Sequence, residues 1–424
     1  MTLTTPEPTT TDPLGDVAII DCDAHFTEPP DLWTSRAPAS MNGKVPVQKT
    51  VDGRTGWYLD DEVWASTGGN TIQQGHNKIL GSHVVQPFSD IDPAAWSVPE
   101  RLELMDEQGI HAEIIYPNGV GFASNHIFAI ADLTRRQAIL QIYNDFFADI
   151  QDESGGRLLP QAMLPIWDME LTVAEMQRMA DRGIRGFTLS DKPEMIGLPE
   201  LWEDYYTPMW DTFEQTRSVA NFHIGAGATR EDLESIRGSR FKTREQRMAD
   251  EAEERRKNPG KASTWWNEFD SQRRLAVHAT QMYMSNVRII INLCMSNLFD
   301  RHPGLKIVSA ESGIGWVPFI LEALEYQYDE MVTVPDELSH AQRRPREYFT
   351  DHLYVMWWFE QSGPAKLIAD IGVNNVLVET DVPHPTCLYP TARAHFAKVL
   401  ADVDEHTKRR VLQDNAAELY RIEL

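Results

Sequence analysis

Eight short apolar segments are spread along this chain, and amphipathic helical patterns separate most of them. Short runs rich in aliphatic and β-branched residues predict buried strands. We expect strands at 19–25, 112–116, 158–163, 186–189, 218–223, 305–310, 352–356 and 376–380. Strands that alternate with helices predict a parallel sheet, and eight such units predict a closed (β/α)8 barrel of the TIM type, in the α/β class.

Two long segments interrupt this alternation and are expected to be insertions in a single domain over residues 17–424. Residues 26–92 are loop-rich, with a hairpin turn predicted at 51–54, Val-Asp-Gly-Arg. Residues 228–270 include a stretch dense in charges of both signs, which predicts an exposed helical insertion or lid after the fifth strand. The longest regular helix is expected at 271–300. Residues 1–16 are rich in Thr and Pro and are expected to form a disordered tail rather than a signal peptide.

The charge balance excludes one class of partner. The net charge is −25, from 39 basic and 64 acidic residues, whereas nucleic-acid binding needs a basic surface. No apolar run approaches the length of a membrane span. The three cysteines are scattered without a CxxC pair, which suggests a reducing compartment. We therefore expect a cytoplasmic homo-oligomer that acts on a small molecule, with neither nucleic acid nor membrane as partner.

Four potential metal ligands stand at the carboxyl ends of three predicted strands. Asp23 and His25 end the first strand and, two residues apart, share one face; His223 ends the fifth strand, and Asp381 follows the eighth. In a barrel these ends converge on one mouth. Taken singly, the residues also fit strand-end polar groups, a core histidine and a helix N-cap. Together, two imidazoles and two carboxylates predict one divalent ion, for which we expect Zn²⁺, with Mn²⁺ and Fe²⁺ as alternatives.

The segments around these residues resemble a known family. They are the run 20–25 with Glu28-Pro29, Phe222-His223-Ile224-Gly225, the run 301–306 (Arg-His-Pro-Gly-Leu-Lys) and the run 380–385 (Thr-Asp-Val-Pro-His-Pro). They are similar to the amidohydrolase-related metal-dependent barrels, in the branch of the aminocarboxymuconate-semialdehyde and resorcylate decarboxylases. The resemblance extends over nearly the whole chain. It implies that Asp23, His25, His223 and Asp381 hold the metal, and that Asp381 moves a proton during turnover.

One position departs from that family. Many of its decarboxylases carry a catalytic histidine at the end of strand six, where this chain has Ser-Ala-Glu-Ser-Gly at 309–313 and places Glu311. Two roles stay open for Glu311: a catalytic or substrate-orienting carboxylate, or a cap of the following helix. Of the tryptophans that end strand seven, Trp357 is expected to face the mouth and contact the substrate. His384 is expected to bind substrate or to brace the loop after Asp381.

These residues suggest a metal-dependent hydrolase of a small aromatic or cyclic substrate. In this interpretation Asp381 accepts a proton from a metal-activated water, and Glu311 serves as a second base. Hydrolysis is preferred because of the charge of the site: a +2 ion with three ionised carboxylates leaves a net charge of about −1, which repels a carboxylated substrate. The alternatives are a non-oxidative decarboxylase of an aromatic or unsaturated acid, to which Asp381 delivers a proton, and a barrel in which metal serves stability without turnover.

Overall fold

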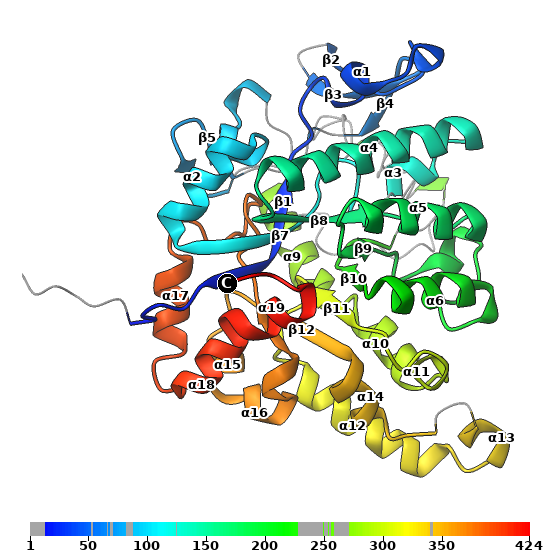
Figure 1. Cartoon of the computed structure of the whole chain (residues 1–424), viewed down its shortest axis with the longest axis vertical. Helices are drawn as coiled ribbons and strands as arrows, with labels where there is room; N and C mark the ends of the chain where they lie inside the picture. The colour runs from blue at the N-terminus through cyan, green and yellow to red at the C-terminus, as the bar shows by residue number, and fades with distance from the viewer. Residues whose placement is uncertain are drawn as a thin grey trace, which may run out of the picture.

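The strands form an eight-stranded parallel barrel, as the sequence predicts. The computed structural model describes residues 13–51, 54–65, 67, 71–81, 88–123, 125–227, 249, 253, 256–257, 271–339 and 342–424. The barrel strands are β1 (Ile19–Phe26), β7 (Ile110–Pro117), β8 (Leu158–Met163), β9 (Gly186–Thr188), β10 (Val219–His223), β11 (Ile307–Ala310), β12 (Leu353–Trp357) and β13 (Val376–Val378). They pair in chain order, and every pair is parallel. Helices surround them (Figure 1).

The barrel is closed by a seam between β1 and the segment that follows β13. Ala24 forms an isolated parallel bridge with Val382. The His25 amide donates to Val382 O at 2.7 Å, and the Asp381 amide donates to Asp23 O at 2.8 Å. The seam therefore joins, through backbone hydrogen bonds, the two chain segments that carry three of the four predicted ligands.

Amphipathic helices pack on the outside of the barrel. The longer ones are α2 (Val98–Gln108), α4 (Leu133–Glu153), α5 (Met169–Asp181), α6 (Thr207–Thr216), α9 (Ser271–Met282), α10 (Val287–Cys294), α12 (Val317–Met331), α14 (Pro345–His352) and α17 (Ala392–Val399). The shorter ones are α1 (Leu32–Arg36), α3 (Asn125–Phe128), α11 (Leu298–Arg301), α13 (Pro335–Leu338), α15 (Ser362–Lys366), α16 (Ile368–Ile371), α18 (Glu405–Arg409) and α19 (Asn415–Tyr420). Aspartates cap three of these helices: Asp132 accepts from the Arg135 amide in α4, Asp168 from the Leu171 amide in α5, and Asp404 from the Thr407 amide in α18.

The single helix expected at 271–300 is wrong, because the chain there forms α9, α10 and α11 in succession. Asn286 stands at the first break, and its side-chain amide donates to Phe222 O at 2.7 Å and to Ser309 Oγ at 3.1 Å. This buried side chain thus ties the break to the ends of β10 and β11. An asparagine that satisfies two neighbouring strands competes with the continuation of a helix.

Apolar side chains fill the barrel interior up to the predicted site, where the Tyr116 ring lies 5.1 Å from the His223 ring, centroid to centroid. Apolar residues from seven strands form one buried cluster with α19: Ile20, Cys22, Ala112, Ile114, Tyr116, Leu159, Val219, Val308, Ala310, Met356, Leu377, Ala416, Ala417, Leu419 and Tyr420. Two tyrosines of the cluster share one acceptor, since Tyr420 Oη and Tyr116 Oη donate to Asn221 Oδ1 at 2.6 and 3.1 Å. The centre of the barrel is therefore a packed core, and chemistry is confined to the mouth.

The first insertion contains the predicted hairpin. Strands β2 (Val47–Val51), β3 (Arg54–Leu59) and β4 (Glu62–Ala65) form an antiparallel sheet in which Val51 pairs with Arg54. A smaller pair follows, β5 (Ile72–Gln73) with β6 (Asn77–Lys78). Trp33 of α1 packs against Trp57 and Trp64 of the sheet, with ring centroids 4.8 and 5.4 Å away, and its Nε1 donates to Ile139 O of α4. This sheet and α1 lie together beside α4 (Figure 1).

Several predictions fall on residues that the structure does not describe. Asp52 and Gly53 of the hairpin turn, residues 1–12 of the tail, and most of the charged segment 228–270 lie outside the described residues. The disordered tail, the helical lid and the single-domain assignment stay predictions. Within the expected tail, Leu14 is described and is buried in the core.

Candidate metal centre and active site

A β-bulge in β1 brings Asp23 and His25 to the inside of the barrel mouth. The register advances by three residues on β1, from Asp21 to Ala24, while the partner strand β7 advances by two. The extra residue allows Cys22 to belong to the interior cluster although Asp23 also faces inward. Strict alternation, which would turn Cys22 to the opposite face from Asp23, is therefore wrong at this point. Asp23 and His25 are both fully buried.

Asp23 bridges the two histidines of the site. Its Oδ1 lies 3.4 Å from His25 Nε2, and its Oδ2 lies 3.2 Å from His223 Nε2. The two Nε2 atoms are 3.2 Å apart. Residues separated by two hundred positions thus converge on one point at the ends of β1 and β10, as the sequence predicts for a closed barrel.

The hydrogen bonds on the far side of each imidazole assign its proton. His25 Nδ1 lies 3.0 Å from Pro117 O, and His223 Nδ1 lies 2.6 Å from Ile224 O. A carbonyl oxygen only accepts, so each Nδ1 carries the hydrogen and each neutral ring turns a lone pair inward from Nε2. Both carboxylate oxygens of Asp23 are buried without a hydrogen-bond partner. Lone pairs alone therefore face one another at the centre of this group.

A divalent cation fits this arrangement. Two ligand atoms each about 2.1 Å from one ion lie about 3.0–3.4 Å apart at octahedral or tetrahedral angles, which matches the spacings of Asp23, His25 and His223. Burial holds the pKa of the Asp23 carboxyl well above its usual range and that of His25 well below it. A cation would lower the pKa of Asp23 again, because it favours the ionised carboxylate, and it would further favour the neutral imidazole that burial already favours at His25.

Asp381 lies at the edge of the same group. Its Oδ1 is 3.6 Å from His25 Nε2 and 2.7 Å from His384 Nδ1, and its Oδ2 accepts from Thr386 Oγ1 at 3.1 Å. The residue has a φ of 62°, a left-handed backbone conformation that is uncommon for a non-glycine residue. The helix-cap alternative for Asp381 does not hold, because the next helix, α17, begins at Ala392 with Thr391 at its N-cap.

His384 connects Asp381 to the loop after β7. Its Nε2 lies 3.2 Å from Asn118 Oδ1, and its ring lies 3.8 Å from the His25 ring, centroid to centroid. The Asn118 side chain donates through Nδ2 to Thr27 Oγ1 at 2.9 Å. Burial lowers the pKa of His384 to about 4. The geometry fits the bracing role among the two that the sequence left open, and nothing in the sequence pattern distinguished Asn118 from other loop residues.

Glu28 supports the loop after β7 through hydrogen bonds. Its carboxylate accepts from the Gly119 amide at 2.9 Å and from Tyr143 Oη at 3.0 Å. Asn118 and Gly119 belong to the loop that also carries Phe122. A buried glutamate with these partners holds loop geometry rather than taking part in chemistry. The Glu-Pro pair after strand one was part of the family resemblance, but sequence reasoning assigned Glu28 no role.

Glu311 reaches the histidines from the opposite side. Its Oε2 lies 3.4 Å from His223 Nε2, and its φ is 54°. The cap alternative for Glu311 does not hold. Glu360 serves the start of the following helix instead, since its Oε1 accepts from the Ile314 and Gly315 amides at 3.1 and 2.9 Å. The Glu311 amide donates to Glu379 Oε2 at 3.0 Å, and sequence reasoning missed Glu379 altogether.

The expected contact of Trp357 with substrate is wrong. Its ring packs against Phe396 of α17, with centroids 5.2 Å apart, so it lies in the core outside the barrel wall. Met356 occupies the interior position on β12, and alternation therefore turns Trp357 outward. Trp358 instead packs against Tyr283, whose pKa is raised by burial and further by Glu311 and Asp381.

Phe122 is the aromatic side chain that covers the histidines. Its ring centroid lies 4.1 Å from that of His223, 5.0 Å from that of His25 and 5.8 Å from that of His384. Thr188 at the end of β9 donates through Oγ1 to Phe122 O at 2.6 Å and thereby holds this loop over the mouth. A phenylalanine in a loop gives no periodic signal, so the sequence did not identify it.

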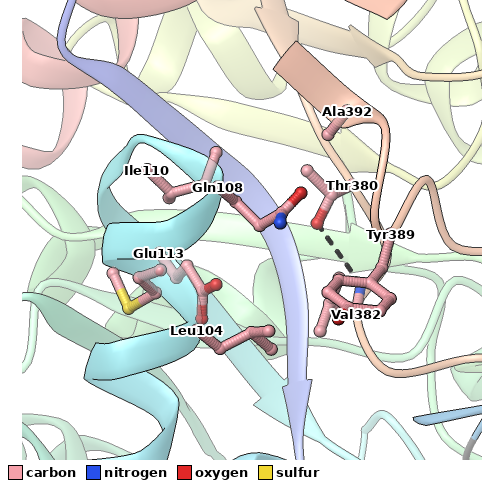
Figure 2. Close-up of a pocket in the computed structure, with 9 residues that line it drawn as sticks. Leu104, Gln108, Ile110, Glu113, Thr380, Val382, Tyr389 and Ala392 are labelled. Atoms are coloured by element: carbon pink, nitrogen blue, oxygen red, sulfur yellow. Dashed lines mark hydrogen bonds between the residues drawn. The ribbon is translucent and has the colours of Figure 1, made fainter. Parts of the chain in front are cut away.

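A small cavity lies behind the seam, away from the histidines. It has a volume of about 10 Å³, enough for roughly one water. Residues from α2, β7, the segment after β13 and the start of α17 line it (Figure 2): Leu104, Met105, Gln108, Ile110, Glu113, Thr380, Val382, Tyr389 and Ala392. Thr380 and Val382 flank Asp381, but the cavity is too small for an aromatic substrate.

A closed parallel barrel with two imidazoles and several carboxylates at its mouth is typical of TIM-barrel proteins that bind a divalent metal ion there. Comparison with known families makes this specific. The amidohydrolase family matches residues 20–422, and the chain belongs to that family. The described helices include none that is both long and apolar enough to cross a membrane.

The curated relatives share one activity. The chain is 26% identical over 294 residues to the gamma-resorcylate decarboxylase of Polaromonas sp. strain JS666, covering 67% of this chain and 76% of the relative. It is 25% identical over 332 residues to that of Rhodococcus jostii strain RHA1, covering 76% and 87%. Two further curated relatives, from Rhizobium, carry the same name.

Solved structures agree in fold. An amidohydrolase from Mycobacterium avium subsp. paratuberculosis K-10 superposes with a TM-score of 0.66 at 19% identity, covering 96% of this chain and 99% of that one. A dihydroxybenzoic acid decarboxylase from Polaromonas sp. JS666, with bound manganese and the inhibitor 2-nitroresorcinol, superposes with a TM-score of 0.57 at 19% identity, covering 96% and 97%.

The expectation of hydrolysis is overturned by these relatives, because the curated ones are decarboxylases. The charge argument behind that expectation counted every carboxylate as ionised. Asp381 Oδ1 lies 2.7 Å from His384 Nδ1, a contact that requires a proton between the two groups. The negative charge that a carboxylated substrate would meet is therefore smaller than that count.

Proposed function

We propose that this protein is a metal-dependent carboxy-lyase that removes CO₂, without oxidation, from a small aromatic acid with a hydroxyl group beside its carboxylate. The decarboxylase relatives support the reaction type, since the chain spans 76–87% of the length of two of them. Their printed names also support the substrate class. The chain's own geometry supplies an independent argument.

The contact between Asp381 and His384 carries the proposal. The side-chain Nδ2 of Asn118 donates to Thr27, so the Oδ1 of Asn118 is the atom that faces His384 Nε2. Since that oxygen only accepts, His384 Nε2 must carry a hydrogen. A neutral His384 then has a bare Nδ1, 2.7 Å from Asp381 Oδ1. A contact this short requires a proton between the two atoms, either as Asp381–COOH or as a protonated His384. In either form the pair stores one acidic proton beside the histidines.

A stored proton suits decarboxylation rather than water activation. Asp381 gives its proton to the ring carbon that bears the carboxylate. The bond between that carbon and the carboxylate then breaks, CO₂ leaves, and the bonding electron pair restores the aromatic ring. His384 holds Asp381 in place and lies in line to return a proton to it after each turnover.

The residues that would hold the ion are Asp23, His25, His223 and Asp381. A divalent ion there would bind the substrate carboxylate and its neighbouring hydroxyl oxygen and withdraw electron density from them. For its identity we propose Mn²⁺ in place of the expected Zn²⁺. Carboxylate-rich sites suit harder cations, and the decarboxylase structure from Polaromonas contains manganese.

Phe122 would position the substrate ring. Its half-buried side chain lies over both histidines of the site, so an aromatic substrate bound to the ion would contact its ring. Aromatic pairs of this kind contribute about 0.5–1.5 kcal/mol beyond simple burial. Such contact orients the plane of the substrate relative to Asp381.

Turnover of a panel of hydroxylated benzoic acids tests the proposal. Protein stripped with a chelator and reloaded with Mn²⁺ should release CO₂ from at least one ortho-hydroxybenzoate, with the phenol as product. Activity should disappear on chelation and return with metal. A metal-loaded protein that releases no CO₂ from any member of the panel would contradict the proposed reaction.

A further inference from the structure

Two carboxylates occupy matching positions on either side of the histidine pair. Asp381 Oδ1 lies 3.6 Å from His25 Nε2, and Glu311 Oε2 lies 3.4 Å from His223 Nε2. Glu311 follows directly on β11, Asp381 comes three residues after the end of β13, and both have a left-handed backbone, with φ of 54° and 62°. A left-handed conformation is costly for a residue with a side chain, and such conformations concentrate at functional sites. Glu311 thus lies as close to one histidine of the pair as Asp381 lies to the other.

Glu379 holds the backbone of Glu311 in this conformation. Its Oε2 accepts from the Glu311 amide at 3.0 Å, across the end of the intervening strand β12. Glu379 is fully buried, and its other oxygen, Oε1, has no hydrogen-bond partner. Burying a carboxylate with a single hydrogen-bond donor is costly. The hydrogen bond from the Glu311 amide constrains the backbone of Glu311.

We propose that Glu311 is a fifth protein ligand of the divalent ion, and that Glu379 is the positioning residue that holds it there. The inference rests on the metal site of the proposed function but not on its reaction. It would give this chain a carboxylate ligand at the strand end where the family resemblance implies a histidine. Five protein ligands would leave fewer open positions on the ion for substrate oxygens than four.

Metal binding and coordination test this without a substrate. The probes are Mn²⁺, for the dissociation constant, and Co²⁺, whose visible absorption reports coordination number and geometry. Glu311→Gly removes the carboxylate at a position where glycine relieves the backbone. We expect Mn²⁺ affinity to fall by roughly 10- to 100-fold, as for lost ligands and their supports, and the Co²⁺ spectrum to change. Glu311→Gln, which keeps shape, gives a second estimate of the same loss.

Variants of Glu379 separate a ligand from a nearby charge. Glu379→Gln keeps an acceptor for the Glu311 amide while removing the carboxylate charge, so the Co²⁺ spectrum should stay that of the parent. Glu379→Leu removes the acceptor, so its spectrum should shift toward that of Glu311→Gly. The double variant Glu311→Gly/Glu379→Leu should match Glu311→Gly alone, because a positioning residue has no effect once its target is gone.

Glu360→Gln is the matched control, because that carboxylate serves the same loop through the Ile314 and Gly315 amides. It should leave both affinity and spectrum unchanged. A parent-like Co²⁺ spectrum in Glu311→Gly would overturn the proposal, with or without weaker binding, because charge alone can weaken affinity. This outcome is distinct from failure of the proposed reaction, since a five-ligand site can be demonstrated in a protein that releases no CO₂.

Discussion

Replacing Arg101 by methionine should destabilise the protein strongly, because this one side chain holds the seam of the barrel together. The guanidinium is fully buried and forms an ion pair with Glu113 at 2.7 Å. It also donates to three backbone oxygens: Ala94 O at 3.3 Å, His25 O at 3.1 Å and Val382 O at 3.1 Å. The last two belong to the chain segments on either side of the seam.

The expected cost follows from the pair and its surroundings. Breaking a buried ion pair by removing one partner costs about 3–5 kcal/mol, because the other charge stays buried without compensation. The three carbonyl groups also lose a donor. We therefore expect Arg101→Met to lower the free energy of unfolding by at least about 3 kcal/mol, and to weaken metal binding because His25 and Asp381 both adjoin the seam.

Urea unfolding of the metal-free protein measures this cost without the stabilisation that bound ion adds. The control is the double variant Arg101→Met/Glu113→Leu, in which no charge is left unpaired. It should recover about 2 kcal/mol relative to the single variant, since paired charges replaced by apolar groups are often neutral. A loss below about 1 kcal/mol in Arg101→Met, the range of an exposed pair, would refute this account of the seam.

Three further predictions concern chemistry, specificity and pH. Asp381→Asn should lower kcat by roughly a hundredfold or more, because the amide cannot give the proton, while elemental analysis should still find bound metal; near-normal turnover would show that Asp381 does not move the proton. Phe122→Leu should raise KM for an aromatic acid by roughly 2- to 10-fold, from the lost ring contact, and an unchanged KM in steady-state assays would remove Phe122 from the substrate site. His352 stacks on Phe299 with centroids 4.3 Å apart and donates through Nδ1 to Leu305 O, and burial lowers its pKa below 6.5. Below pH 6.5 the unfolded chain therefore binds a proton at His352 that the folded one resists, so His352 costs no stability above pH 6.5 and lowers the free energy of unfolding as the pH falls below that value. His352→Asn, which keeps the donor, should lose less over that range in urea titrations, and parallel losses would contradict the assignment.

The fold and the positions of the site residues could be predicted because both follow from simple periodicities. Eight apolar runs marked the strands, and polar residues at the ends of parallel strands must meet at one mouth. That reasoning located Asp23, His25, His223 and Asp381 at a common point. Glu311 was singled out differently, by the family resemblance, because it stands at the strand end where many members of the family carry a histidine.

The residues that were missed depend on details that a single sequence does not display. The bulge in β1 changes which faces Cys22 and Asp23 occupy, and no pattern marks an extra residue in an otherwise regular strand. Trp357 was wrongly assigned to the mouth because the sequence does not show which alternate residues of β12 face inward. The structure shows that Met356 does, so Trp357 faces outward. Arg101 appears as one more charge on an amphipathic helix, although it is fully buried.

The mistaken preference for hydrolysis has a related origin. Charge counting needs protonation states, and these depend on burial and on partners such as His384 that only the folded chain brings into contact. The role of Glu379 also depends on a contact that only the folded chain makes. Its carboxylate accepts from the Glu311 amide, and the sequence around Glu379 gives no sign of that contact.

The central claim is that this protein exchanges a ring carboxylate for a proton. The most direct measurement is to incubate Mn²⁺-loaded protein with ortho-hydroxybenzoates in D₂O and to examine the products by NMR and mass spectrometry. We expect a phenol carrying one deuterium at the carbon that bore the carboxylate, formed by the parent and lost with Asp381→Asn. Full recovery of the unchanged acids, with no deuterated phenol from any of them, would contradict it.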